Sequence, residues 1–404
     1  RDVLRIANQN RPRLFDRRIV LPDQLYMRVV EADERLGVDG SVLKPMDQVR
    51  LERDLVEAYR EGLRAVAIVF LHAYRHPVHE QVAAEIAQKV GFTQISVSHQ
   101  VSPLIKIVSR GDTTLVDAYL SPVLRRYVDK LAARMPGVEL LFMQSSGGLV
   151  HADHFMGRDA ILSGPAGGIV GMARTAEEAG FTKVIGFDMG GTSTDVSHYA
   201  GHFERNEETL VAGVRMRTPM LSIHTIAAGG GSILKFDGAR CRVGPESAGA
   251  YPGPKSYRNG GPLTVTDANL MLGKIQPSHF PAVFGAEGNE PLDEASVSAE
   301  FKRWAIAMGR TPEAVAEGFI DLAVQQMANA IRKISIGEGH EPKNYVLQCF
   351  GGAGGQHACL VAEALGIETV LLHPFSGVLS AFGIGLADQT VIRTETLELS
   401  LIHI

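Results

Sequence analysis

The sequence predicts an α/β protein with a parallel or mixed sheet, and three observations carry that prediction. Apolar segments of strand length alternate with segments of helical periodicity along most of the 404 residues. The 43 glycines gather in a few clusters, and most of these clusters follow an apolar, strand-like segment. Hydrophobic residues make up 45% and charged residues 21% of the chain, the balance of a globular protein with two or three domains.

The expected elements follow from the periodicity, read in chain order. The first part predicts helices over 51–63, 78–90 and 113–135 and strands over 65–70, 95–97 and 138–143. The second part predicts a strand over 184–187, a β-meander over 196–205 turning at Gly201, a long ordered loop over 232–262, a linker over 287–293, helices over 294–308, 311–336 and 356–365, and strands over 346–350 and 369–372. We place a domain boundary near Ser145, so that residues 1–144 form one part and residues 145–404 the other.

Composition and charge exclude several classes of protein. The net charge of −5 and the absence of a basic block argue against nucleic acid as the main partner. Three cysteines (Cys241, Cys349 and Cys359) with no C-x-x-C pair argue against a disulfide framework or a structural zinc site and favour a reducing, cytoplasmic setting. No apolar run approaches the ~18 residues needed to cross a bilayer, so we expect no membrane partner.

The clearest chemical signal is the segment 186–196. A strand runs into Asp188, then a Gly-Gly turn, hydroxyl side chains, Asp195 and a second strand. The turn itself consists of Gly190, Gly191, Thr192, Ser193 and Thr194. Such a turn can wrap a phosphate chain, because glycines let backbone N–H groups approach the oxygens and carboxylates hold Mg²⁺ through its waters. The alternative is a tight hairpin whose side chains bond only their own backbone.

A second glycine cluster lies between a strand and a helix at 350–358 and contains Gly351, Gly352, Gly354 and Gly355. It can hold an anion or nucleotide at the helix start, or it can serve close packing of helix and strand. It lacks the spacing of a dinucleotide fingerprint, and no Walker lysine follows. Two further clusters, at 163–168 and 228–232, are turns when taken alone. Together the four clusters predict a cleft for a phosphorylated ligand.

Histidines at helical spacing offer a weaker signal. His72, His76 and His79, with Glu80 beside them, could form a metal-binding face. Pro77 interrupts that helix, so capping or substrate contacts are the favoured roles.

Several single residues leave alternatives open. His357 and His373 stand beside glycine or proline turns, where a substrate contact and simple surface exposure are both open. Arg215 and Arg217 would share one face of a strand and could hold a carboxylate, although surface solvation is favoured. Ser145 stands in no G-x-S-x-G elbow, which argues against a serine hydrolase.

The motifs in their order resemble the hydantoinase A/oxoprolinase family. The resemblance rests on residues 163–168, 188–195, 243–249 and 350–357. Four further segments, 14–16, 31–35, 262–269 and 377–381, are most similar to the branch of the family that hydrolyses 5-oxoproline. Glu246, inside the third motif, is a substrate contact or an organiser of its loop.

The resemblance implies an actin/hexokinase-like ATPase fold with two lobes around a nucleotide cleft. It implies ATP-dependent opening of a cyclic amide, 5-oxo-L-proline to L-glutamate in glutathione metabolism, through phosphorylation of the amide carbonyl. It also implies Mg²⁺ and commonly K⁺, a hydantoinase B-like half (fused or separate), and a homo-oligomer. Asp188 would be the catalytic residue that orders Mg²⁺, with Asp195 a second candidate metal ligand. The 190–194 segment would line the phosphates, and the four glycines of 351–355 would form the adenosine side.

The chain also departs from the family. A first Asp-x-Gly-Gly-Thr phosphate motif near the N-terminus and the downstream hydrolytic half are both missing, and the tail at 399–404 does not match. We therefore expect a fragment that is incomplete at the N-terminus and truncated at both ends. By itself it should not turn over 5-oxoproline.

Three alternatives remain. Within the family, the chemistry could be N-methylhydantoin hydrolysis or that of the ATP-using subunit of an acetone-type carboxylase. From another class, the chain could be a non-catalytic, actin-like regulatory ATPase. The third alternative is an α/β domain with no nucleotide site.

Overall fold

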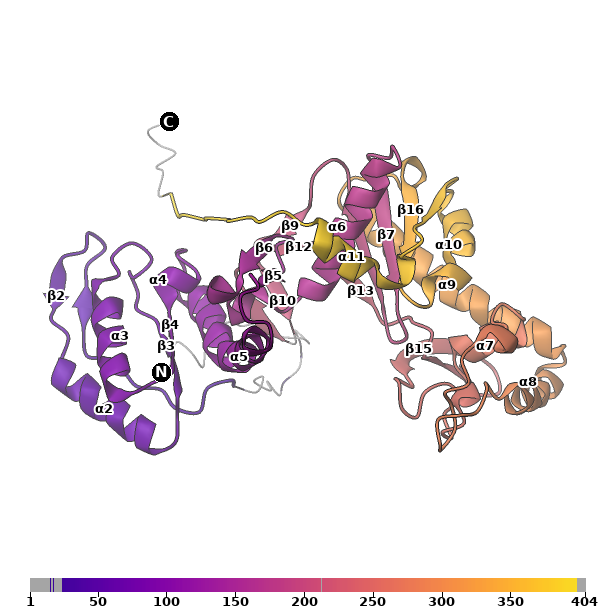
Figure 1. The fold of residues 1–404 in the computed structure, drawn as a ribbon, viewed down its shortest axis with the longest axis horizontal. Coiled ribbons are helices and arrows are strands. Elements are labelled where there is room, and N and C mark those ends of the chain that lie inside the picture. The colour runs from indigo at the N-terminus through magenta and orange to yellow at the C-terminus, as the bar shows by residue number, and fades with distance from the viewer. Residues whose placement is uncertain (1–14, 16, 18–23, 212, 398–404) are drawn as a thin grey trace. The chain divides into compact units, whose positions relative to one another are not determined.

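A computed structural model describes residues 15, 17, 24–211 and 213–397 of the chain. The chain groups into two compact units (Figure 1). Unit 1 comprises Arg1–Ser163, Arg205–Met220 and Asp388–Ile404, and unit 2 comprises Gly164–Glu204 and Leu221–Ala387. The sequence-based division into residues 1–144 and 145–404 is a division of the chain into consecutive domains, and it stays a prediction. No helix among the described residues is long and apolar enough to cross a membrane.

Unit 1 is built around two parallel strands, β3 (Ala65–Ile68) and β4 (Gln94–Val97). Helices α2 (Gln48–Arg60) and α3 (Val78–Val90) bury Leu51, Leu55 and Ile86 with these strands in one apolar cluster. The long helix α5 (Ile107–Arg134) also contacts both strands. The remaining elements are β1 (Arg35–Leu36), β2 (Val42–Lys44), α4 (Ser98–Val101), β5 (Leu141–Met143), β6 (Leu149–His151), η1 (Ala152–His154), η2 (Gly157–Asp159), β9 (Arg205–Asn206), β10 (Thr209–Val211) and β11 (Val214–Met216), with β12 (Met220–Leu221) at its edge.

A fully buried pair of charged residues holds the centre of unit 1 together. Glu80 of α3 accepts hydrogen bonds from the Phe70 N–H, the Ser98 hydroxyl and the His99 N–H. Arg110 of α5 donates to the same Ser98 hydroxyl, at 2.9 Å, and to three main-chain carbonyls. Neither side chain is exposed to solvent. Removing one partner would leave a buried charge uncompensated, so this pair fixes how α3, α4 and α5 meet.

Unit 2 contains a five-stranded mixed sheet in the order β13-β8-β7-β16-β17. Its strands are β7 (Val184–Met189), β8 (Thr194–Tyr199), β13 (His224–Ile226), β16 (Val346–Phe350) and β17 (Val370–Leu372). β7 is antiparallel to β8 and parallel to β16, so it lies at the centre of the sheet. All six residues of β7 except Asp188 are buried.

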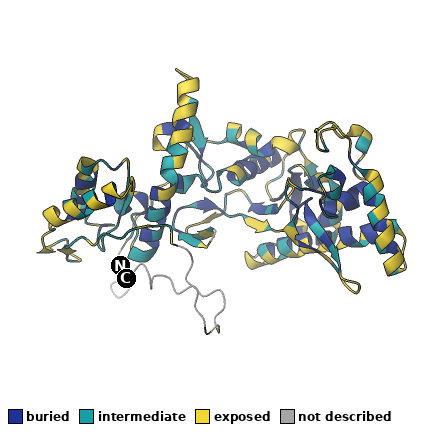
Figure 2. Ribbon diagram, turned by 90° about the horizontal axis from the view of Figure 1, so that it is seen from below, coloured by how far each residue is buried: buried dark blue, intermediate teal, exposed yellow. Residues whose placement is uncertain are grey.

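Helices cover both faces of this sheet (Figure 1). On one face, Met172 of α6 (Ser163–Glu178) lies against Gly186 and Ser197. On the other, Ile185 and Phe187 join the core of α9 (Pro312–Gly337) and α10 (Ala358–Leu365). The three central strands β8, β7 and β16 are almost entirely buried, and residues of this class are dark blue in Figure 2. The alternation along β7 therefore sends Gly186 and Asp188 toward α6 and Ile185 and Phe187 toward α9.

The rest of unit 2 packs beyond this core. A hairpin of β14 (Ser232–Phe236) and β15 (Cys241–Ser247) contacts α7 (Val265–Met271) and α9. The remaining elements are η3 (Lys255–Tyr257), η4 (Pro277–His279), α8 (Glu294–Met308), η5 (Pro342–Asn344), η6 (Gly354–Gln356), η7 (Ser376–Val378) and α11 (Leu379–Leu386). Buried Asp267 accepts hydrogen bonds from the N–H groups of Lys255, Ser256 and Thr264, and thereby fixes the loop before α7.

The α/β prediction is confirmed, and two local predictions are wrong. Helices or strands overlap most of the expected ranges, and α3 matches its range end to end. Residues 232–262 are not one loop, because 232–247 form the β14–β15 hairpin despite their glycines and proline. The meander over 196–205 is also wrong: after Gly201 only one bridge forms, Tyr199 to Phe203, and β13 takes the place beside β8.

A buried histidine ties β8 to the end of α9 in unit 2. His198 Nε2 lies 2.7 Å from the Ser335 hydroxyl, which itself donates to Ile331 O. The neighbouring His340 bonds Glu204 at 2.9 Å and the Tyr345 hydroxyl at 2.8 Å. Burial, together with the His340 charge, lowers the pKa of His198 to about 4. The folded unit therefore keeps His198 neutral.

We predict that unit 2 loses stability as the pH falls from 6.5 to 4. The folded pKa of His198 lies below its ordinary 6.5, so its contribution is complete above pH 6.5 and disappears toward pH 4. The loss is about 3 kcal/mol from the size of the shift. Asp188, with a raised pKa of about 6, acts in the opposite direction, and buried His357, whose pKa is also lowered to about 4, acts in the same direction as His198, so the sum of the three is a loss.

Urea unfolding followed by fluorescence of Trp304, the one tryptophan and a residue of α8, measures this. His198→Gln should flatten the pH dependence, and His279→Asn, on the exposed surface, should leave it as it is. Equal slopes for the wild type and His198→Gln would contradict the assignment.

Candidate functional site

Three of the glycine clusters meet at one edge of the sheet in unit 2. The Gly230 N–H donates to Gly190 O at 3.1 Å, and the Gly231 N–H donates to Gly191 O at 2.5 Å. The Ala353 N–H donates to Met189 O at 2.9 Å. Segments 188–195, 228–232 and 350–357, far apart in the chain, are therefore joined main chain to main chain.

The turn between β7 and β8 presents unpaired donors. The Gly190 N–H closes the turn on Ser193 O at 3.0 Å. Gly191 and Thr192 are exposed, and within the described part of the chain their N–H groups have no hydrogen-bond partner. A Cβ at Gly229 would lie 2.7 Å from Ser193 N, so Gly229 supports the turn from behind at a distance no side chain allows. Consecutive free N–H groups in such a turn form a concavity that binds anions.

Two carboxylates stand beside this turn. Asp188 and Asp195 are cross-strand partners in the β7–β8 ladder. Asp195 accepts a hydrogen bond from the Thr225 hydroxyl at 2.6 Å and so joins β8 to β13. The Asp188 carboxylate has no hydrogen-bond or ion-pair partner among the described residues. Burial, and secondly the charge of Asp195, raise the pKa of Asp188 to about 6.

The hydroxyls of the turn divide into two kinds. Thr192 is exposed and Ser193 half-buried, and neither hydroxyl has a partner among the described residues. Thr194 is fully buried, and its hydroxyl donates to Ala228 O at 2.5 Å. Thr194 thus holds the 228–232 segment in place instead of facing the open side of the turn.

The glycines of 351–355 also divide. Gly351 has φ +83°, and a Cβ there would strike the Asp188 Oδ1 atom and lie 2.5 Å from Met189 O. Gly354 is buried, and its Cβ would lie 2.6 Å from Cys349 Sγ. At Gly352 and Gly355 a side chain would meet nothing within 4 Å. Gly351 and Gly354 are therefore needed for packing, whereas Gly352 and Gly355 border open space.

The fourth cluster has a different role. Residues 163–168 begin α6, as expected, and Gly167, Gly168 and Gly171 of this helix face α11. A Cβ at Gly167 would lie 2.6 Å from Ser380 O, and one at Gly171 2.7 Å from Leu379 O. These glycines allow two helices to approach closely, so we do not include them in the ligand site.

The histidine candidates of unit 1 do not converge. His79 Nδ1 lies 2.5 Å from Glu34 Oε2, His76 Nε2 lies 3.2 Å from Val38 O, and the Glu80 oxygens are occupied as described above. The described residues contain no group of three or more histidine, cysteine, aspartate or glutamate side chains arranged to hold a metal.

Arg215 lies in β11 and Arg217 directly follows it, so the two do not share a strand face, but they do hold a carboxylate. It is the chain's own Glu208, at 3.0 Å from Arg215 and 3.9 Å from Arg217. Glu246 pairs with Lys235 at 2.7 Å, which makes it an organiser of the β14–β15 hairpin. Surface solvation is therefore wrong for the two arginines, and the ion pair of Glu246 with Lys235 favours the second of the two roles left open for it, the organiser of its loop.

Two other single residues are also accounted for. Ser145 is buried and donates to Asp159 O. His373 is half-buried and stacks on Phe382, with ring centroids 5.2 Å apart.

The sequence did not reveal a buried polar network behind the 350–357 cluster. Asn269 of α7 donates to Gln356 Oε1 at 2.7 Å and to His357 Nε2 at 3.0 Å. Lys274 donates to Gln356 O at 3.3 Å. His357 is fully buried, so surface exposure is wrong for it, and burial lowers its pKa to about 4. The only sequence signal for Asn269 was its place in the 262–269 motif.

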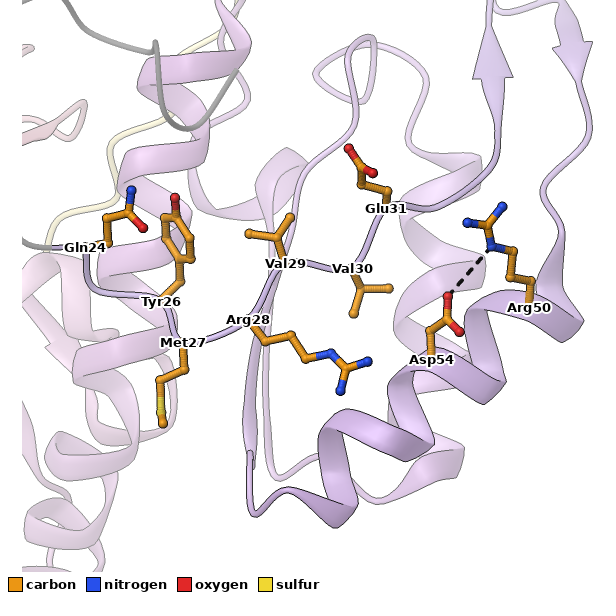
Figure 3. Close-up of a pocket in the computed structure, with 9 residues that line it drawn as sticks. All are labelled: Gln24, Tyr26, Met27, Arg28, Val29, Val30, Glu31, Arg50 and Asp54. Atoms are coloured by element: carbon orange, nitrogen blue, oxygen red, sulfur yellow. Dashed lines mark ion pairs between the residues drawn. The ribbon is translucent and has the colours of Figure 1, made fainter. Parts of the chain in front are cut away.

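Unit 1 contains a cavity, but no glycine cluster lines it. It has a volume of about 520 Å³ and lies between the segment 24–31 and α2 (Figure 3). Its walls carry the Arg50–Asp54 ion pair, at 3.8 Å, and Arg28, which pairs with Glu57 at 3.0 Å. These charged side chains are paired with carboxylates of α2 or its C-terminal end, in contrast to the unpartnered Asp188 in unit 2.

The residues at the glycine-rich edge fit a magnesium-bound phosphate group. Free N–H groups and hydroxyls donate to phosphate oxygens, and a carboxylate without a partner is the hard oxygen ligand that Mg²⁺ prefers. The raised pKa of Asp188 also favours a cation site, because a bound cation would stabilise the desolvated negative charge of its carboxylate.

Comparison with known proteins gives consistent results. The family model described as hydantoinase/oxoprolinase matches residues 110–393, and the model of its N-terminal region matches residues 1–91. 5-oxoprolinase 1 of Arabidopsis thaliana is 43% identical over 96% of this chain and 34% of its own length. This chain spans about a third of the length of this and two other curated relatives that it matches.

Two solved structures share the fold. The crystal structure of ATP-dependent caprolactamase from Pseudomonas jessenii superposes with a TM-score of 0.77 at 33% identity, covering 89% of this chain and 53% of that one. The nucleotide-free acetone carboxylase gives a TM-score of 0.72 at 26% identity, covering 88% of this chain and 52% of that one.

We predict that Gly351→Ala destabilises unit 2 by about 1–3 kcal/mol, because alanine resists a positive φ and its Cβ would displace Asp188 or Met189. Gly352 is the next residue of the same turn, and its Cβ would meet nothing within 4 Å. Gly352→Ala should therefore change stability by less than about 0.5 kcal/mol. Urea unfolding followed at Trp304 compares the two. Similar losses for both variants would show that the Gly351–Asp188 contact has no special role.

Proposed function

This chain belongs to the hydantoinase/oxoprolinase family, and on that premise we propose that it is the ATP-binding portion of a 5-oxoprolinase-type cyclic amidohydrolase. The observation that carries the proposal is the unpartnered carboxylate of Asp188 beside the free N–H groups of Gly191 and Thr192. The whole enzyme would use ATP to open 5-oxo-L-proline to L-glutamate.

Each residue of the turn has a stated task in this proposal. Gly190, Gly191, Thr192 and Ser193 bind phosphate oxygens through N–H and hydroxyl groups, and Thr194 supports them from the 228–232 side. Asp188 holds Mg²⁺, which when bound neutralises phosphate charge and orients the phosphoryl group. Asp195, already bonded to Thr225, raises the negative potential at Asp188 and so favours a cation there.

The glycines of 351–355 form the adenosine side of the same edge. Gly351 and Gly354 allow the turn to pack against β7, and Gly352 and Gly355 leave room for a ligand. The proposed architecture is the actin/hexokinase-like ATPase fold with two lobes around the nucleotide. It is supported by the α/β fold that this chain shares with ATP-dependent caprolactamase. Phosphoryl transfer in such a site depends mainly on positioning and electrostatic stabilisation.

The substrate and partners are carried over from the relatives. The identity to a protein named 5-oxoprolinase 1 supports 5-oxoproline, and the name "caprolactamase subunit alpha" supports a separate or fused second half, here a hydantoinase B-like one. Potassium as activator, homo-oligomerisation and a cytoplasmic setting belong to the same proposal. The likeness to acetone carboxylase keeps a carboxylase subunit as the second candidate.

The test is ADP release by the chain together with its hydantoinase B-like half. The compounds are 5-oxoproline, hydantoin, N-methylhydantoin, caprolactam, acetone plus bicarbonate, and no addition. Stimulation by 5-oxoproline, with glutamate formed in step, would support the proposal. Stimulation by acetone or another amide would replace the substrate, and turnover indifferent to every compound would favour a regulatory ATPase.

We predict that Asp188→Asn lowers ADP release at least 100-fold, because an amide holds Mg²⁺ far less well than a carboxylate. The Trp304 urea midpoint should stay the same or rise, since the variant removes a desolvated charge. Asp321→Asn, on the exposed side of α9, is the matched control and should leave both measurements unchanged. Normal turnover with normal Mg²⁺ dependence in Asp188→Asn would remove Asp188 from the site.

A further inference from the structure

The side chain of Gln356 stands at the open edge of the glycine-rich turn. It follows Gly355, where a side chain would meet nothing within 4 Å, and precedes α10. It is half-buried, its Oε1 atom accepts from Asn269, and its Nε2 group has no partner among the described residues. Gln356 therefore has an amide with one end fixed and the other end free to donate.

Asn269 decides which end is free. Its Nδ2 group donates to both Gln356 Oε1 and His357 Nε2, at 2.7 and 3.0 Å. His357 can accept at Nε2 because it is fully buried and neutral. With its oxygen engaged in this way, Gln356 is oriented so that its two N–H donors are available to a ligand.

This network lowers the stability of the fold, because it leaves buried polar atoms unpaired. Asn269 Oδ1 and His357 Nδ1 are both buried without a hydrogen-bond partner in the described chain. Unpaired buried polar atoms each cost about 1–3 kcal/mol. A network that leaves two such atoms is better explained by the orientation it imposes on Gln356 than by a gain in stability.

A second donor, from the segment that follows α7, lies beside this turn. The Lys274 ammonium donates to the main-chain oxygen of Gln356 at 3.3 Å, and its side chain is otherwise exposed. It fixes the backbone of the turn and leaves further N–H donors toward solvent. Gln356 and Lys274 together present N–H donors that have no partner, and such donors suit a part of the ligand that is rich in acceptor atoms.

We propose that Gln356 is a nucleotide-binding residue that donates to the adenosine part of the ligand, and that buried Asn269 and His357 are the positioning residues that orient it. The inference rests on the proposed function. The register of β7 and β16 pairs Asp188 with Phe350, so the turn that follows β16 borders the phosphate-binding turn that follows β7. If the phosphates bind at residues 190–193, the adenosine part of the same nucleotide lies at the neighbouring turn, residues 351–356. Ring nitrogens and ribose oxygens supply the acceptors.

The experiment compares two ligands by calorimetric titration of the 404-residue chain: ADP with Mg²⁺, and tripolyphosphate with Mg²⁺, which has no adenosine. Gln356→Ala should weaken ADP binding about five- to tenfold, the worth of one hydrogen bond, and change tripolyphosphate binding less than twofold. Gln88→Ala, an exposed glutamine of α3 in unit 1, is the control and should change neither.

Asn269 is tested through a double-mutant cycle. Asn269→Ala should weaken ADP binding like Gln356→Ala, and the double variant should lose no more than either single one. If the Trp304 urea midpoint shows that Asn269→Ala does not fold, Asn269→Ser takes its place in the cycle. If the double variant lost ADP affinity by the product of the two single-variant factors, the positioning role of Asn269 would be overturned.

The controls separate the possible failures. Unchanged ADP binding in Gln356→Ala, or equal losses for both ligands, would overturn the contact with adenosine. A wild-type chain that binds neither ligand would overturn the proposed function and this inference together.

Discussion

The main-chain junction around the end of β7 is the constraint on which the candidate site depends. β7 pairs antiparallel with β8 and parallel with β16, so both neighbouring turns begin beside Asp188 and Met189. Met189 O accepts from the Ala353 N–H, and Gly351 packs directly on Asp188. A side chain at position 351 would separate the two turns, and the unpartnered carboxylate would then have no defined place.

Glycines serve three different physical purposes in this unit. Gly351 and Gly229 permit backbone approaches that a Cβ would prevent, and Gly167 permits the contact of α6 with α11. Gly191, Gly352 and Gly355 face open space, so at these positions the absence of a side chain leaves room for a ligand. A cluster of glycines is thus not one signal, and its meaning depends on what each missing Cβ would meet.

Charged groups in this chain are either paired within the fold or left without a partner. In unit 1 the buried Glu80 and Arg110 are fully hydrogen-bonded, and Arg215 and Arg217 close on Glu208, so these groups stabilise the fold. In unit 2 Asp188 is left without a partner and its pKa rises. An unpaired, desolvated carboxylate costs stability, which is the usual mark of a group kept for ligand or metal binding.

The sequence by itself determined the α/β class, most helix and strand positions and the segment 188–195, because these depend on local periodicity and on short-range turn chemistry. It was wrong about residues 232–262, where the hairpin pairing of β14 and β15 overrode a composition typical of loops. Only the tertiary structure decided that Thr194 faces Ala228, that the α6 glycines pack on α11, and that Asn269 reaches Gln356. Each of these contacts joins residues more than 30 positions apart, and no local pattern encodes which distant atom a side chain or a missing Cβ will meet.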